Sequence, residues 1–167
     1  MMPADQRPAT MSDPVIRAYE YFSARAASLA SVFLLIVRLY WGWQFAQTGW
    51  GKLHHLAKVT DFFTSLGIPA PGLNAVFVAS LEVVGGIALA LGIGSRFFAL
   101  LLTIDMSVAY LTAGRANLLA FFSDPGKFYS DDAFTFLFAS LIVLIFGPGK
   151  LALDELAARY SKRGNEA

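Results

Sequence analysis

Long apolar runs, separated by short polar or glycine-rich connections, dominate the pattern of this sequence. Four such runs are long enough, or nearly long enough, to cross the roughly 30 Å hydrocarbon core of a bilayer as helices, and they cover residues 28–48, 73–92, 97–113 and 131–147. Gly67–Gly72, which holds two prolines, and Gly147–Gly149 interrupt the helical pattern between and after them. We therefore predict an all-α fold, a four-transmembrane-helix bundle in residues 28–149.

Polar tails flank the predicted bundle on both sides. In residues 1–27, Asp13-Pro14 is a helix start, and apolar residues follow it at helical spacing. Residues 150–167 show the same amphipathic spacing, with Leu153 and Leu156 on one side. We expect a first tail that is partly disordered and a short interfacial helix in each tail. A signal peptide is not expected, because the first apolar run begins after more than two dozen residues and is too long.

Composition agrees with a membrane protein. Hydrophobic residues make up 56% of the 167 residues and charged residues only 15%, which lies outside the usual range of soluble domains. A net charge of +1 suggests no nucleic-acid partner, and the lipid bilayer is the expected one. The absence of cysteine excludes disulfides and thiolate metal sites.

The distribution of Lys and Arg predicts the orientation in the membrane. Eight of these residues lie in the two tails and the second connection, and four lie in the first and third connections. Because positive residues are concentrated on the cytoplasmic side, we expect both termini in the cytoplasm. The expected location is the bacterial inner membrane.

Three ionisable side chains interrupt the apolar runs: Arg38 in the first, Glu82 in the second and Asp105 in the third. A charge at the bilayer centre costs about 2.5 to 3.5 kcal/mol on insertion scales, so such residues face a bundle interior. Each lies near the midpoint of its run, which predicts one layer at a similar depth. One carboxyl is then expected to hold a proton or to face another cation. This layer is the candidate ligand or proton site, and a structural ion-pair network is the alternative.

Small residues near these charges predict how the first two helices pack. One stripe of the first helix holds five residues at steps of four and three: Arg38, Gly42, Phe45, Gly49 and Lys52. On the second helix, Gly86 follows Glu82 by four residues. Glycines allow close approach of transmembrane helices. Gly42, Phe45, Gly49 and Gly86 are therefore the predicted packing residues.

Lys52, His54 and His55 are predicted to lie at the membrane interface. Adjacent histidines on a helix point about 100° apart, so His54 and His55 are not expected to hold one metal or haem. No metal site is predicted. Their expected role is a polar contact or the attraction of an anionic partner, and proton donation to a bound substrate is the alternative.

A family resemblance rests on several of these residues. The run Arg38–Phe45, followed by Gly49 and Lys52-Leu53, resembles the first-helix signature of the DoxX family of small four-helix membrane proteins. Glu82 falls where the family's second helix carries its acidic residue.

The resemblance continues in the connections. Leu66–Pro69 is similar to the loop before the family's second helix, and Gly92 with Arg96 resembles the turn after it. Gly147–Asp154 resembles the closing motif, although Ala152 stands where a serine is frequent. Asp131 and Asp132 lie where the family tends to show a glutamate.

The resemblance implies a non-redox membrane subunit of a quinone-linked oxidoreductase complex in sulfur or oxidative-stress metabolism. Quinone is the implied ligand, oxidoreductase subunits or a second copy of the chain are the candidate partners, and no intrinsic cofactor is expected. The chain is not expected to be catalytic alone, and no catalytic residue is assigned. The alternative is a membrane scaffold or a small-solute or proton transporter, whose buried charges are structural or line a pathway.

Overall fold

Every regular element in residues 14–164, the part of the chain that the computed structural model describes, is a helix. The helices in chain order are α1 (Pro14–His54), α2 (Leu56–Ser65), α3 (Pro71–Leu91), α4 (Ser95–Thr112), α5 (Arg115–Leu119), α6 (Pro125–Tyr129), α7 (Asp132–Phe146) and α8 (Leu153–Gly164). Three of them, α1, α3 and α4, are long and apolar enough to cross a membrane. The fourth predicted span corresponds to α7, an apolar helix of 15 residues.

Large apolar side chains cover the outside of these helices. Phe33, Ile36 and Trp43 on α1 are at least half exposed, and so are Phe77 on α3 and Phe97 on α4. Such a surface is unstable in water and suits contact with lipid. The chain is therefore a multi-pass membrane protein, with the bilayer as its surroundings.

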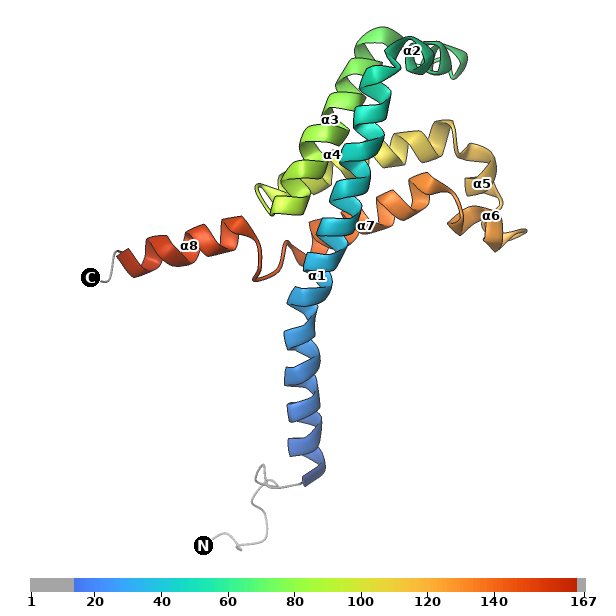
Figure 1. Cartoon of the computed structure of the whole chain (residues 1–167). Coiled ribbons are helices and arrows are strands. Elements are labelled where there is room, and N and C mark those ends of the chain that lie inside the picture. Colours follow the sequence, from blue (N-terminus) through green and yellow to red (C-terminus); the bar gives the residue numbers. More distant parts are fainter. Residues whose placement is uncertain (1–13, 165–167) are drawn as a thin grey trace, which may run out of the picture.

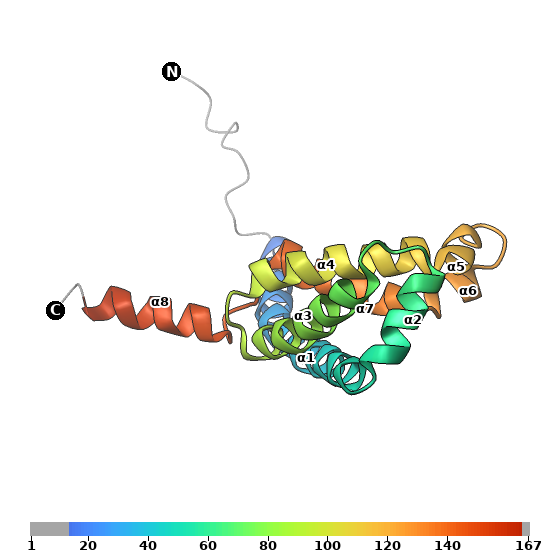
Figure 2. The same cartoon turned by 90° about the horizontal axis from the view of Figure 1, so that it is seen from above.

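The helices form two closely packed pairs, α1 with α3 and α4 with α7 (Figure 1). The core lies where the two pairs meet, and its fully buried side chains include Phe45, Leu89, Leu102 and Val143. Phe45 of α1 meets Phe136 of α7 edge to face, with 4.6 Å between the ring centroids. α2 crosses from the end of α1 toward α4 (Figure 2).

Glycine and proline determine where the central helices begin and end. Pro71 begins α3, where its missing N–H is not needed. Gly92 ends that helix with φ 78°, a left-handed conformation that glycine adopts without strain, and its N–H donates to the carbonyl oxygen of Ala88. At the start of α7, the Asp131 side chain accepts a hydrogen bond from the N–H of Ala133 at 2.9 Å.

The N-terminal region differs from the prediction. Instead of an interfacial helix followed by a separate span, α1 is one continuous helix of 41 residues, and its first half extends beyond the other helices (Figure 1). Residues 15–41 contain neither glycine nor proline, so nothing in the sequence breaks the helix there. Residues 14–27 are thus helical, and the disorder predicted for the rest of this tail falls on residues outside the described part. The C-terminal tail does contain a separate helix, α8.

Candidate functional site

The seam between α1 and α3 depends on glycines. A Cβ atom on Gly42 would lie 2.6 Å from the carbonyl oxygen of Gly86 and 2.8 Å from the amide nitrogen of Ala90. A Cβ atom on Gly49 would lie 2.7 Å from both the carbonyl oxygen of Ala79 and the amide nitrogen of Val83. The two backbones therefore touch, as in other small-residue contacts between transmembrane helices. These contacts also show that α1 and α3 are antiparallel.

This close approach brings Lys52 and Glu82 together. Lys52 Nζ lies 2.5 Å from Glu82 Oε1 and donates a hydrogen bond to it. The Glu82 side chain is only 1% exposed, whereas that of Lys52 is 33% exposed. The second carboxylate oxygen of Glu82, Oε2, has no hydrogen-bond partner. The pair thus compensates a charge on Glu82 but leaves one buried acceptor unused.

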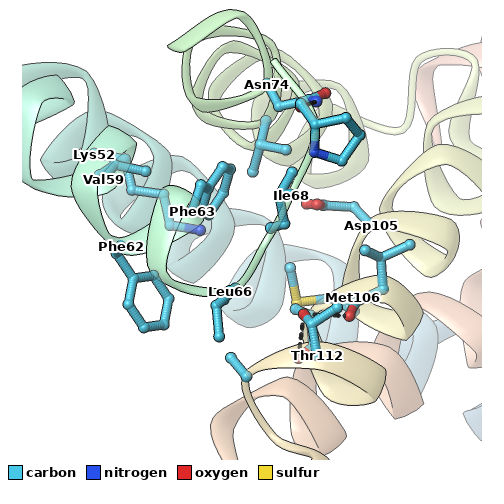
Figure 3. A pocket seen from close by; sticks show the side chains of 15 residues that line it. Lys52, Val59, Phe62, Phe63, Leu66, Ile68, Asn74, Asp105, Met106 and Thr112 are labelled. Carbon is cyan, nitrogen blue, oxygen red and sulfur yellow. Dashed lines mark hydrogen bonds between the residues drawn. The ribbon is translucent and has the colours of Figure 1, made fainter. Parts of the chain in front are cut away.

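A pocket of about 390 Å³ lies next to this pair, with walls from the end of α1, α2, the following loop, α3 and α4. Lys52 and Asp105 are its charged residues, and Asn74 and Thr112 add polar groups (Figure 3). The remaining lining residues are mostly aliphatic or aromatic, among them Phe62, Phe63, Leu66, Val78, Met106 and Ala109. An apolar cavity with few polar groups is the usual form of a small-molecule site.

Asp105 reaches the pocket from α4 (Figure 3). Its side chain is half-buried, and its Oδ2 atom is buried without a hydrogen-bond partner. Asp105 and Lys52 line the same cavity, and Glu82 contacts Lys52 directly. We refer to Lys52, Glu82 and Asp105 together as the charged cluster.

Arg38 lies elsewhere, which corrects the expectation of a single charged layer. Its fully buried guanidinium packs against Gly92 and donates from Nη2 to the carbonyl oxygen of Leu151 at 3.2 Å. Glu82, by contrast, lies beside Gly49. Glu82 and Gly92 are ten residues apart along α3, which is about 15 Å at 1.5 Å per residue. Arg38 is therefore about three helical turns from the charged cluster.

The separation follows from the direction of the helices. Arg38 and Lys52 belong to one stripe of α1, and the antiparallel α3 places Glu82 opposite the later end of that stripe. The midpoints of the apolar runs do not predict which residues of α1 and α3 lie opposite each other, because α1 is much longer than its apolar part. Lys52, which the sequence predicts at the membrane interface, thus takes the position beside Glu82 that was expected of Arg38.

Arg38 holds the segment after α7. Arg38 donates a hydrogen bond to the carbonyl oxygen of Leu151, as described above. In addition, the N–H of Asp154 donates to the carbonyl oxygen of Gly92 at 3.1 Å, so residues 151–154 are held at the end of α3. Two guanidinium nitrogens of Arg38, Nε and Nη1, have no hydrogen-bond partner. The geometry gives Arg38 a positioning role for this segment.

Replacing Arg38 by methionine is expected to loosen that segment. Hydrogen bonds to charged groups contribute about 1.5 to 3 kcal/mol, so exchange of the Asp154 amide hydrogen should accelerate by about tenfold or more. Hydrogen–deuterium exchange of the protein in detergent measures this. Arg115→Met, at an exposed position, is the control. Unchanged exchange at Asp154 in Arg38→Met would contradict the positioning role.

The two histidines lie at the end of α1, away from the pocket lining. His54 Nδ1 is 2.9 Å from the carbonyl oxygen of Trp50, and His55 Nδ1 is 2.9 Å from that of Gly51. Both side chains are exposed. Within residues 14–164, no group of three or more His, Asp or Glu side chains is arranged to hold a metal ion.

Sequence reasoning missed α2 as a wall of the pocket. No helix is predicted from the sequence in residues 56–65, which lie between the first two predicted spans. Val59, Phe62, Phe63 and Leu66 nevertheless recur at helical spacing, which is the signal of an amphipathic helix. That signal was available, but only the fold shows that this apolar face closes a cavity against α4.

The fold and the charged cluster define a class: small all-α proteins that cross the membrane several times and keep charged side chains between their helices. The family model of the DoxX family matches residues 33–115 of this chain, which is consistent with membership in that family. The matched region contains Arg38 and the whole charged cluster. This agrees with the resemblance seen in the sequence motifs.

Two relatives match most of the chain. A Bacillus subtilis (strain 168) protein named "Putative oxidoreductase CatD" is 27% identical over 131 residues, which cover 78% of this chain and 91% of that protein. A Haemophilus influenzae protein described as "Uncharacterized protein" is 28% identical over 135 residues, which cover 76% of this chain and 84% of that protein. No solved structure matches the chain significantly.

Proposed function

We propose that the protein is a membrane subunit of a quinone-linked oxidoreductase complex and that it binds the quinone in the pocket beside the charged cluster. The observation that carries the proposal is the pocket itself. An apolar cavity of about 390 Å³ has Lys52 and Asp105 in its wall, and Glu82 is in contact with Lys52. A quinone combines an apolar tail with a ring whose oxygens form hydrogen bonds, so both parts of the molecule have suitable surroundings.

The chemistry of the lining residues supports this ligand class. Lys52 Nζ has three N–H donors, and only one is used by Glu82 Oε1, which leaves donors for a ring oxygen. Phe62 and Phe63 offer aromatic surfaces for the ring. The name of the Bacillus subtilis relative, "Putative oxidoreductase CatD", points in the same direction.

Electrons are proposed to pass through a partner subunit rather than through this chain. The sequence contains no cysteine for an iron–sulfur cluster or a redox disulfide, and its two adjacent histidines cannot grip one haem from the same face. In this proposal the chain binds and orients the quinone, and the partner carries the redox cofactor. Purification in mild detergent, followed by identification of co-purifying subunits and bound quinones, tests the assembly. A lone chain without bound quinone would argue against it.

Filling the pocket is expected to weaken quinone binding. Ala109 lines the cavity from α4, and Ala109→Leu adds three carbon atoms at the lining without changing any charge. We expect the affinity for a short-chain ubiquinone to fall at least about tenfold, because the ring and the new side chain compete for one space. Equilibrium binding to the protein in lipid nanodiscs measures this. Ala116→Leu, at an exposed position on α5, is the control. If the Ala109→Leu protein and the unaltered protein bound the quinone with equal affinity, the pocket would not be the quinone site.

We also propose that α7 completes four membrane spans and that both termini lie in the cytoplasm of a bacterial cell, with the chain in the inner membrane. The support is the apolar character of α7 and the distribution of Lys and Arg between the two sides. A periplasm-active reporter fused after Ala167 should then give no signal. A strong signal would place the C-terminus on the other side of the membrane.

The alternative function is a scaffold or a transporter of protons or small solutes. The observation that favours it is the Lys52–Glu82 pair, because paired buried charges also occur where helices are merely held in register. Transport predicts proton or solute flux in liposomes that contain this chain alone. The quinone-subunit proposal predicts no such flux.

A further inference from the structure

Two carboxylate oxygens in and beside the pocket have no hydrogen-bond partner. Glu82 Oε2 and Asp105 Oδ2 are buried carboxylate oxygens without a partner. Glu82 Oε1 already accepts from Lys52 at 2.5 Å. A carboxylate oxygen without a partner can accept a hydrogen bond, so a ligand that carries a donor matches the ionised form of this site.

The charge balance points to the same kind of ligand. Lys52 supplies one positive charge, whereas Glu82 and Asp105 supply two negative charges when both are ionised. Lys52 is committed to Glu82 by a direct ion pair, so the excess acceptor capacity lies with Asp105. An O–H group of a ligand would satisfy the Asp105 carboxylate without adding charge.

We propose that the pocket selects the reduced form of a quinone, the hydroquinone, over the oxidised form, and that Asp105 determines this preference. The inference rests on the proposed quinone site. A hydroquinone carries two O–H donors, whereas the two oxygens of a quinone can only accept. Asp105 accepts a hydrogen bond from the hydroquinone, and Lys52 donates one to an oxygen of either form.

The two residues lie in different walls of the cavity. Asp105 enters it from α4 and Lys52 from the end of α1 (Figure 3). Glu82 does not line the cavity and is 1% exposed, so its effect on the ligand passes through Lys52. Asp105 is thus the carboxylate in direct reach of a ring hydroxyl.

The test compares the two redox forms on the full-length protein. A short-chain ubiquinone and its hydroquinone are titrated, without oxygen, onto the protein in lipid nanodiscs. We expect the hydroquinone to bind at least about tenfold more tightly. Tighter binding of the reduced form raises the midpoint potential of the bound couple, by about 30 mV for each tenfold difference in affinity, which gives a second readout.

Asp105→Asn separates the role of the carboxylate from that of the cavity. The amide is nearly the same size and donates as well as accepts, so the preference should fall to about threefold or less while both forms still bind. Asp61→Asn removes an exposed carboxylate of α2 that does not line the pocket, and it should keep the full preference.

The possible outcomes distinguish a failure of the hydroquinone preference from a failure of the proposed quinone site. Equal binding of both forms to the unaltered protein, or tighter binding of the quinone, would overturn the hydroquinone preference and leave the quinone site intact. A preference that survives in Asp105→Asn would overturn the role of Asp105. Binding of neither form would overturn both the inference and the proposed quinone site.

Discussion

Replacing Lys52 by methionine is expected to lower the free energy of unfolding by about 3 to 5 kcal/mol, the usual effect of removing one partner of a buried ion pair. Glu82 is 1% exposed and has Lys52 Nζ at 2.5 Å as its counter-charge. Without Lys52, the carboxylate must remain charged and unpaired between α1 and α3 or take up a proton. Both alternatives destabilise the folded state. The effect is measured by unfolding the purified protein in mixed detergent and monitoring the loss of helix by circular dichroism.

Two further variants show whether the effect belongs to the pair. In the double variant Lys52→Met with Glu82→Leu, no buried charge remains, so we expect most of the lost stability to return. Lys58→Met removes an exposed lysine of α2 and should change the free energy of unfolding by less than about 0.5 kcal/mol. If Lys52→Met were as stable as Lys58→Met, the ion pair would have no structural importance.

Alanine at Gly42 and at Gly49 is expected to separate α1 from α3. Each new Cβ atom would lie within 2.8 Å of backbone atoms of α3, and backbone atoms cannot move aside as the end of a side chain can. Overpacking of this kind costs about 1 to 3 kcal/mol at each site, so the double variant should lose about 2 to 6 kcal/mol. The same unfolding measurement applies. The distance between Lys52 and Glu82 should also increase, which would weaken ligand binding in the pocket.

Gly51 offers a matched control on the same helix. A Cβ atom there would have no other atom within 4 Å, apart from its immediate surroundings in the helix. Gly51→Ala should therefore leave the free energy of unfolding unchanged or raise it by up to about 1 kcal/mol, since alanine favours the helix more than glycine does. Comparable losses in Gly51→Ala and Gly42→Ala would mean that close packing against α3 does not explain the result.

The elements of this fold were largely readable from the sequence because they depend on local properties. Apolar length predicts α1, α3 and α4, and the proline at position 71 and the glycine at 92 mark the bounds of α3. The spacing of Gly42 and Gly49 on one face of α1 indicated a close helix contact, which the structure places against α3. Helix α2 was missed because its amphipathic pattern has meaning only once α3 and α4 are in place.

The sequence by itself determined that the chain is helical, that it belongs in a membrane, and that Arg38, Glu82 and Asp105 are residues that a bundle must bury. Tertiary structure alone decided which of these charges meet. The antiparallel register of α1 and α3 places Lys52, rather than Arg38, beside Glu82, and it takes Arg38 to the segment after α7. The physical reason is that local periodicity defines the face of a helix on which a residue lies, whereas the depth at which two faces meet depends on backbone contacts between segments far apart in the chain.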